Sequence, residues 1–188
     1  MTDKNSKDTN IFGFAGSLRK DSYNKMLLRA AQELSPENVK IDIFDLEGID
    51  LFSQDLENEP NDKLKTFKGK IKAADGILIV TPEYNYSVPG VLKNAIDAAS
   101  RPHGTNPFEE KPVGIMGAST GMIGTARAQY HLRQSLVFFN AYVLNRPEIM
   151  VTFSEKKFDQ AGILTDEMTR QKVKEFMVFL GQWIVKFK

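Results

Sequence analysis

The sequence has no cysteine and only two histidines, His103 and His131, among its 188 residues. The absence of cysteine excludes a disulfide framework and a thiol nucleophile. Two histidines so far apart along the chain also argue against a zinc site of the usual Cys/His kind, and we expect no metal. If this protein carries out redox chemistry, a bound cofactor must therefore carry the electrons.

A strong net charge and long apolar runs are missing as well. The net charge is +1, so no strong field directs the protein to nucleic acid or to a membrane surface. No segment approaches the roughly eighteen apolar residues of a membrane span, and the polar first ten residues contain no secretory signal. We expect a cytoplasmic protein with a flexible tail over residues 1–9 and a single domain over residues 10–188.

Short apolar runs alternate with helical patterns along the chain. Strands are predicted at 11–15, 39–44, 76–81, 112–117 and within 141–151, where Asn145-Arg146-Pro147 interrupts the last one. Helices are predicted at 22–34, 62–74, 89–100, 124–139 and 165–187. This alternation predicts an α/β fold, a parallel sheet with helices on both faces. Two strand orders are common for it, the dinucleotide-binding order and the flavodoxin-like order 2-1-3-4-5.

The loop after the first strand has the composition of a phosphate site. Gly16 allows a tight turn and a close approach of the backbone to a ligand. Ser17, Ser22 and Asn24 supply hydrogen-bond donors, and Arg19 supplies a planar cation suited to phosphate. The helix that follows directs its free N–H groups at the same place. The alternative is a plain connection between strand and helix, capped by Ser22.

Two familiar nucleotide motifs are absent from this loop. It lacks the Gly-Lys-Ser/Thr ending of a Walker loop. Gly13 and Gly16 do not have the spacing of the dinucleotide fingerprint, and no convincing acidic residue ends the second strand. The phosphate ligand is therefore predicted to be a mononucleotide rather than NAD.

Two further loops have an unusual composition. In the loop after the third strand, Tyr84 and Tyr86 can lie along a conjugated ring, and prolines at 82 and 89 stiffen the connection. The loop after the fourth strand is small and rich in glycine, which leaves room for a ring. Surface tyrosines and a simple tight turn are the alternatives. Phosphate donors after strand one and ring contacts after strand three match the flavodoxin-like switch point, where FMN binds. We therefore predict a flavodoxin-like three-layer sandwich with a five-stranded parallel sheet.

Two motifs in these loops carry a resemblance to a known family. They are Gly-Ser-Leu-Arg-x-x-Ser-x-Asn at 16–24 and Pro-Glu-Tyr-Asn-x-Ser-x-Pro-Gly-x-Leu-Lys-Asn-Ala-Ile-Asp at 82–97. From Ile11 to its end the chain resembles the NADPH-dependent FMN reductase family, which includes quinone, chromate and azo-dye reductases. The resemblance implies tightly held FMN and hydride transfer from NADPH or NADH to quinones, free flavin, azo compounds or metal oxyanions. It also implies homodimers or homotetramers with the flavin near the interface.

The resemblance assigns roles by motif position. The phosphate would be held by Ser17, Arg19, Ser22 and Asn24. The ring would be framed by Pro82, Glu83, Tyr84 and Asn85, and its edge touched by Ser119, Thr120 and Gly121. Flavin chemistry of this kind requires no side-chain general base, so we name no catalytic residue. We interpret Glu83 as a residue that fixes the backbone or is solvated.

Some positions and readings stay open. Family members often carry an aromatic residue where this chain has Ala98-Ala99-Ser100-Arg101, and the smaller groups either widen the substrate site or alter the subunit contact. Arg101 faces either a nucleotide phosphate or an acid at an interface. We interpret His103 as a solvated loop residue and His131 as structural. The rival functions are a flavodoxin-like electron carrier without NAD(P)H activity, which near-neutral charge disfavours, and a non-catalytic flavin sensor.

Overall fold

The computed structural model describes residues 8–188. Most of the expected tail, residues 1–7, lies outside the described residues. Strand β1 begins at Thr9, two residues earlier than the strand we predicted and inside the expected tail. Thr9 belongs to the strand because its N–H donates to the carbonyl of Asn38 at 2.8 Å and the residue pairs with Val39 in the neighbouring strand. Thr9 is also buried.

The elements follow the predicted alternation. The strands are β1 Thr9–Ala15, β2 Val39–Phe44, β3 Gly76–Val80, β4 Pro112–Ala118, β5 Tyr142–Val143 and β6 Ile149–Val151. The helices are α1 Tyr23–Leu34, α2 Asp62–Ala73, α3 Gly90–Ala99, α4 Ala126–Phe138 and α5 Glu167–Val185, with short 3-10 turns η1 Gln54–Leu56 and η2 Ser154–Lys156. None of the helices in residues 8–188 is long and apolar enough to cross a membrane.

The sheet has the order β2-β1-β3-β4-β5, and every pairing in it is parallel. This confirms the flavodoxin-like order. The predicted fifth strand is divided into two. β5 pairs with the start of β4 and β6 with its end. Pro147 lies between them and has no N–H to donate to β4, which accounts for the break.

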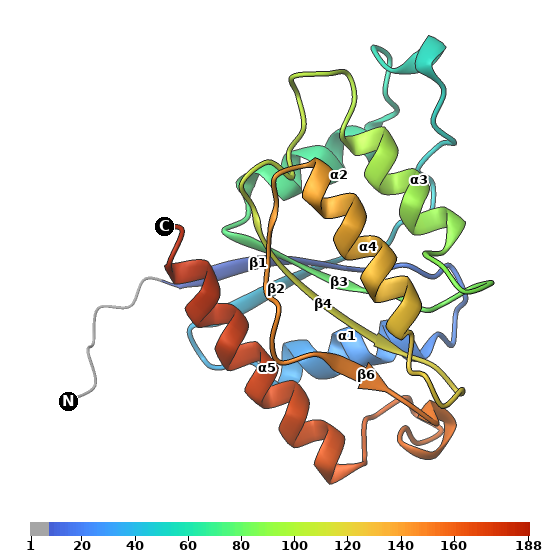
Figure 1. Ribbon diagram of the computed structural model, residues 1–188, viewed down its shortest axis with the longest axis vertical. Coiled ribbons are helices and arrows are strands. Elements are labelled where there is room, and N and C mark those ends of the chain that lie inside the picture. Colours follow the sequence, from blue (N-terminus) through green and yellow to red (C-terminus); the bar gives the residue numbers. More distant parts are fainter. Residues whose placement is uncertain (1–7) are drawn as a thin grey trace.

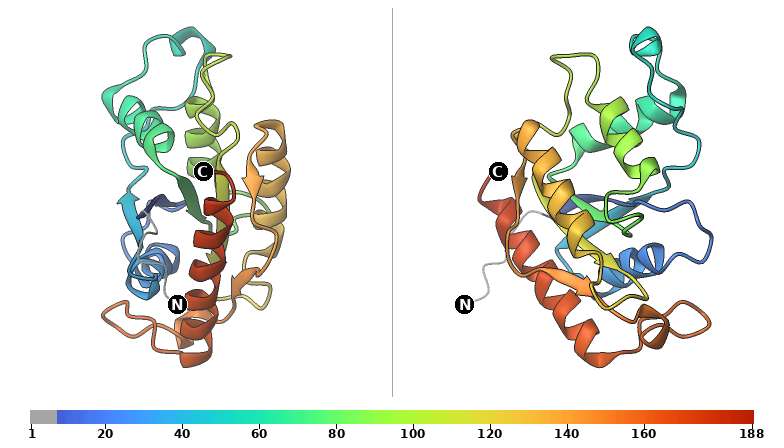
Figure 2. Two further views of the ribbon diagram at one scale, coloured as in Figure 1. Left: turned by 90° about the vertical axis from the view of Figure 1, so that its left-hand side faces the viewer. Right: turned by 45° about the vertical axis from the view of Figure 1, so that its right-hand side comes forward.

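Helices α1 and α5 cover one face of the sheet, and α2, α3 and α4 cover the other (Figures 1 and 2). Strand β3 is buried at every position, as expected when both faces of a parallel sheet are covered. The core under α2 to α4 includes the close aromatic set Phe12, Phe14, Phe44 and Phe67. This confirms the prediction of a parallel sheet with helices on both faces.

Glycine at position 117 permits a close approach at the carboxyl end of β4. A Cβ atom there would overlap the Thr125 hydroxyl and the Thr81 carbonyl oxygen. Thr81 follows β3 and Thr125 precedes α4, so the loops after β3 and β4 meet at this glycine.

Replacing this glycine should therefore be costly. We expect Gly117→Ala to lower the free energy of unfolding by about 2–3 kcal/mol, because the backbone of Thr81 must shift. The matched control is Gly69→Ala in the middle of α2, where no atom lies within 4 Å of the added Cβ. That change should raise the free energy of unfolding by about 0.5–1 kcal/mol. Urea denaturation measures both, and equal effects would contradict the prediction.

Candidate functional site

The loops after β1, β3 and β4 meet at the carboxyl end of the sheet (Figure 1). Their residues line a cleft. The cleft has a volume of about 190 Å³ and opens to solvent. It is lined by Ser17, Arg19, Ser22, Tyr23, Asn24, Pro82, Glu83, Tyr84, Ala118, Ser119 and Thr120. The structure thus brings together all of the predicted site residues except Asn85 and Gly121, which lie in the same loops but not in the wall.

Two serine hydroxyl groups of the first loop can each still donate a hydrogen bond. Ser22 caps α1, and its Oγ accepts the Asn24 N–H at 3.2 Å. The Oγ of Ser17 accepts the Arg19 N–H at 3.3 Å. Both serines are buried, and both act here as acceptors, so each O–H can still donate to a ligand in the cleft.

Further donors surround these hydroxyls. The backbone N–H groups of Leu18, Lys20 and Tyr23 have no acceptor among residues 8–188. The Arg19 side chain is exposed, and no carboxylate in the described part of the chain forms an ion pair with it. Free N–H groups at a helix N-terminus, two hydroxyls and an unpaired guanidinium fit the three oxygens of a phosphate group.

Asn24 fastens the first loop to the third. Its Nδ2 donates to the Ala118 carbonyl at 2.9 Å, and its Oδ1 accepts the Ala118 N–H at 2.9 Å. The side chain is buried, so both bonds are shielded from water. This pair of bonds holds the start of α1 against the end of β4. Sequence reasoning had treated Asn24 only as a ligand donor.

The loop after β3 contains a two-residue hairpin turn. The Tyr84 N–H donates to the Ser87 carbonyl at 3.1 Å, and the Ser87 N–H donates to the Tyr84 carbonyl at 3.0 Å. Asn85 and Tyr86 between them have φ of +49° and +68°. Positive φ at both central residues is the geometry of a type I′ turn, which usually places glycine second. Tyr86 occupies the second position with a positive φ although it lacks the conformational freedom of glycine.

Glu83 connects this turn to α4. Its carboxylate accepts the backbone N–H groups of Arg127 at 3.0 Å and Ala128 at 3.2 Å, and it pairs with the Arg127 guanidinium at 2.9 Å. Thr125 provides no side-chain cap for α4, so Glu83 satisfies the helix terminus from another loop. This agrees with the interpretation that Glu83 fixes the backbone. No local sequence pattern pointed to Arg127, which lies 44 positions away.

The loop after β4 is supported by a segment that sequence reasoning left out of the site. Ser119 donates its N–H to the Val151 carbonyl at 2.9 Å and accepts the Ser154 N–H at 3.1 Å. Its Oγ accepts the Gly121 N–H at 3.0 Å. The contacts depend on where β6 ends, and nothing in the composition of the segment around Ser154 predicts them.

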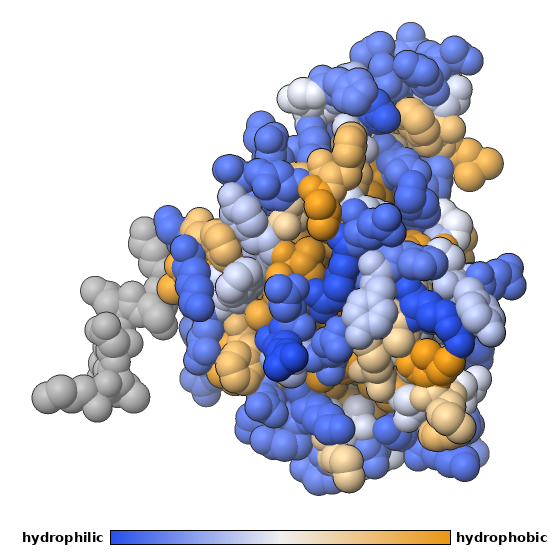
Figure 3. Space-filling model, viewed as in Figure 1, coloured by the Kyte–Doolittle hydropathy of each residue, from blue (hydrophilic) through white to orange (hydrophobic). Residues whose placement is uncertain are grey.

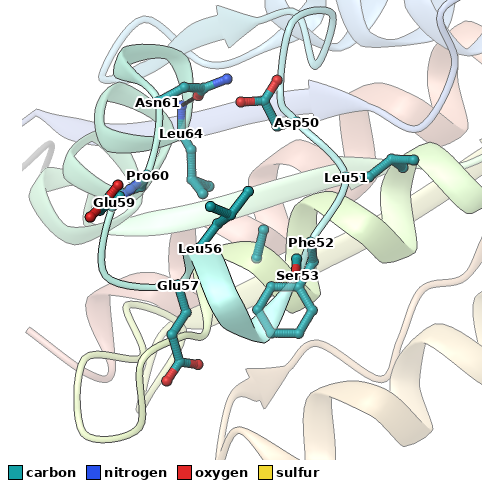
Figure 4. Close-up of a pocket in the computed structure, with 11 residues that line it drawn as sticks. Asp50, Leu51, Phe52, Ser53, Leu56, Glu57, Glu59, Pro60, Asn61 and Leu64 are labelled. Atoms are coloured by element: carbon teal, nitrogen blue, oxygen red, sulfur yellow. Dashed lines mark hydrogen bonds between the residues drawn. The ribbon is translucent and has the colours of Figure 1, made fainter.

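The open positions lie elsewhere. Ala98 lines a mostly apolar pocket under the loop between β2 and α2, where Leu56 and Phe52 point inward and the Glu57 carboxylate points away (Figure 4). Arg101 contacts His103 and lines grooves near the end of α4. None of the residues at 98–103 lines the cleft of its own chain. His131, by contrast, hydrogen-bonds Ser87 at the end of the turn, at 2.9 Å.

Known proteins are similar over the whole of this architecture. Residues 9–156 match the family model described as NADPH-dependent FMN reductase. An NAD(P)H-dependent FMN reductase of Pseudomonas aeruginosa is 45% identical over 186 residues, covering 97% of this chain and 99% of that protein. A 2-hydroxy-1,4-benzoquinone reductase of a Burkholderia species is 44% identical over 169 residues, covering 90% and 92%. The solved structure of FerB, a flavoenzyme NAD(P)H:(acceptor) oxidoreductase from Paracoccus denitrificans, has a TM-score of 0.88 at 32% identity, covering 95% and 98%.

The Asn24 bonds lead to a test of this geometry. We expect Asn24→Ala to lower the free energy of unfolding by about 2 kcal/mol, because it leaves the buried N–H and carbonyl of Ala118 without partners. Arg19→Ala is the control from the same loop. It should change the unfolding free energy by less than about 0.5 kcal/mol and weaken retention of FMN instead. Urea denaturation and cofactor occupancy after purification measure the two effects, and a fully stable Asn24→Ala variant would contradict the prediction.

Proposed function

The chain belongs to the NADPH-dependent FMN reductase family, and we propose that the cleft formed by its three loops holds the FMN of this family. The observation that carries the proposal is the meeting of phosphate-type donors with Tyr84, an aromatic residue of the turn after β3, at one end of a parallel sheet. A flavin has a phosphate at one end and a flat ring at the other, and the two halves of the cleft have matching chemistry.

We assign the binding roles as follows. Ser17, Arg19, Ser22 and the first N–H groups of α1 hold the phosphate, and Asn24 places them. The ring is framed by Pro82, Glu83, Tyr84 and Asn85. The ring edge lies at Ser119, Thr120 and Gly121. Glu83 frames the ring through the backbone that it fixes, because its carboxylate is occupied by the N-terminus of α4.

The protein is an oxidoreductase of this family, with FMN as cofactor. When bound, FMN would supply the redox chemistry that links a hydride of NADPH or NADH to the reduction of a small acceptor. The chain contributes position and charge: Arg19 and the helix terminus anchor the phosphate, and backbone N–H groups at the turn can stabilise negative charge on a ring. We propose quinones as the acceptor class, since relatives are named as quinone reductases, with free flavin, azo compounds and metal oxyanions as further candidates.

The domain and its location follow from the same reasoning. We propose one FMN-binding domain over residues 10–188, with Thr9 joined to it through β1. Both sides of one sheet are covered by helices throughout this range, which supports a single unit. A cytoplasmic location would give the enzyme access to reduced nicotinamide nucleotides.

Reduction by NADPH tests the proposed function. The purified protein should be yellow, and the cofactor released on denaturation should be FMN. Anaerobic stopped-flow mixing with NADPH or NADH should bleach the visible absorbance of the oxidised flavin. Adding 1,4-benzoquinone should restore it. Flavin that stays oxidised would support the electron-carrier alternative, and a colourless protein that takes up no FMN would remove the proposal.

An exposed apolar surface supports the proposed homodimer or homotetramer. Phe138 at the end of α4 is 75% exposed and Leu51 in the loop after β2 is 83% exposed. Phe52 lines both the pocket beside Leu51 and the groove beside Phe138, so the two apolar areas adjoin. Figure 3 shows several apolar groups, with hydrophilic residues between them, on the face that carries α4. The loop is acidic and the groove contains Arg101, so two copies related by a twofold axis can match opposite charges.

Light scattering should therefore give at least twice the mass of one chain at micromolar concentration. Phe138→Glu should shift the protein towards the monomer, because it places a charge in an apolar contact. Met168→Glu, at a similarly exposed apolar position at the start of α5, is the control and should leave the mass unchanged. A wild-type protein that is already monomeric would contradict the proposal.

A further inference from the structure

We propose that His131 is a positioning residue for the flavin. Together with Arg127, it holds the turn at residues 84–87 in the shape that faces the cleft. This inference rests on the proposed binding of FMN and goes beyond it, because neither residue lines the cleft.

The turn needs support from outside itself. Tyr86 has φ of +68° and its side chain is 67% exposed, so no core packing holds it. A bulky residue with positive φ is uncommon, and such a conformation persists only where its surroundings over-determine it. Two backbone bonds between Tyr84 and Ser87 close the turn, but Tyr84 is exposed and Ser87 is only half-buried, so these bonds alone stabilise the turn weakly.

Helix α4 supplies the missing support at three points. Arg127 and His131 are four residues apart, so they lie on one face of the helix, one turn from each other. The Arg127 guanidinium pairs with Glu83 before the turn and lies 3.6 Å from the centre of the Tyr86 ring. The Nδ1 of His131 lies 2.9 Å from the Ser87 Oγ after the turn. The helix therefore contacts the turn at its start, at its strained residue and at its end.

The contacts of Arg127 and His131 with the turn matter for the ring because they orient hydrogen-bond donors of the turn. The N–H groups of Asn85 and Tyr86 have no acceptor within residues 8–188. Asn85 and Tyr86 do not line the cleft itself, so these N–H groups are free for the polar edge of a ring that extends past Tyr84, and their directions follow from the two positive φ values. If the end at Ser87 is released, the turn can relax to a commoner conformation, and these donors then point elsewhere.

A matched set of variants tests this inference. His131→Leu removes the bond to Ser87, whereas His131→Asn keeps a polar atom at the same distance from Cβ as Nδ1. His103→Leu is the control, since His103 is the one other histidine in the sequence and contacts Arg101 instead of the turn. Both positions, 131 and 103, are exposed, so the urea midpoints of the three variants should stay close to that of the wild type.

We expect His131→Leu to raise the Kd for FMN about three- to tenfold, the worth of one hydrogen bond. It should also change the visible circular dichroism of the bound flavin and make its midpoint potential more negative. His131→Asn should recover most of these properties, and His103→Leu should match the wild type. In the protein without flavin, the Ser87 amide should exchange faster in His131→Leu than in the wild type. Once Ser87 is replaced by alanine, His131→Leu should have no further effect.

The outcomes separate the two proposals. A wild-type protein that binds no FMN would overturn the proposed function. If the wild type binds FMN and His131→Leu matches it in Kd, dichroism and Ser87 exchange, only the role of His131 is overturned. The same holds if His131→Asn is as defective as His131→Leu, because the polar atom would then not be what matters.

Discussion

The parallel direction of all strands is the constraint on which the site depends. Each crossover helix returns the chain across a face of the sheet, so β1, β3 and β4 all end at the same edge. The loops after β3 and β4 lie about 65 and 100 residues along the chain from the loop after β1, yet all three meet at this edge. No local sequence signal is needed to bring them together. The helices on both faces also bury β3 completely. The parallel pairing of β3 with β1 and β4 sets the edge from which the loops leave.

Hydrogen bonds between distant segments then fix the shape of the three loops. Asn24 joins the start of α1 to the end of β4 through two bonds to Ala118. Glu83 joins the loop after β3 to the start of α4, and Ser119 joins the loop after β4 to residues beyond β6. Each loop of the cleft is thus held by an element distant in sequence. Loops held in this way keep their shape, so the backbone N–H groups that have no partner in the described residues keep fixed directions towards a ligand.

The turn after β3 shows what this rigidity allows. Its central residues have backbone angles that an isolated peptide of this sequence would rarely adopt. Contacts from Arg127 and the close approach at Gly117 hold the surrounding segments in place. The strain is therefore located next to the cleft, and the stability that offsets it comes from the packed sheet and from α4.

The sequence by itself determined the alternation of strands and helices, the parallel sheet and the unusual composition of the three loops that line the cleft. It could do so because buried strands, amphipathic helices and phosphate-binding loops each have a local pattern of residues. Only the tertiary structure decided how the two halves of the interrupted fifth strand pair with β4, that Asn24 joins two loops, and that Arg127, His131 and Ser154 contact the loops around the cleft. These roles arise from atoms brought together across the sheet edge, and the spacing of residues along the chain contains no information about such contacts.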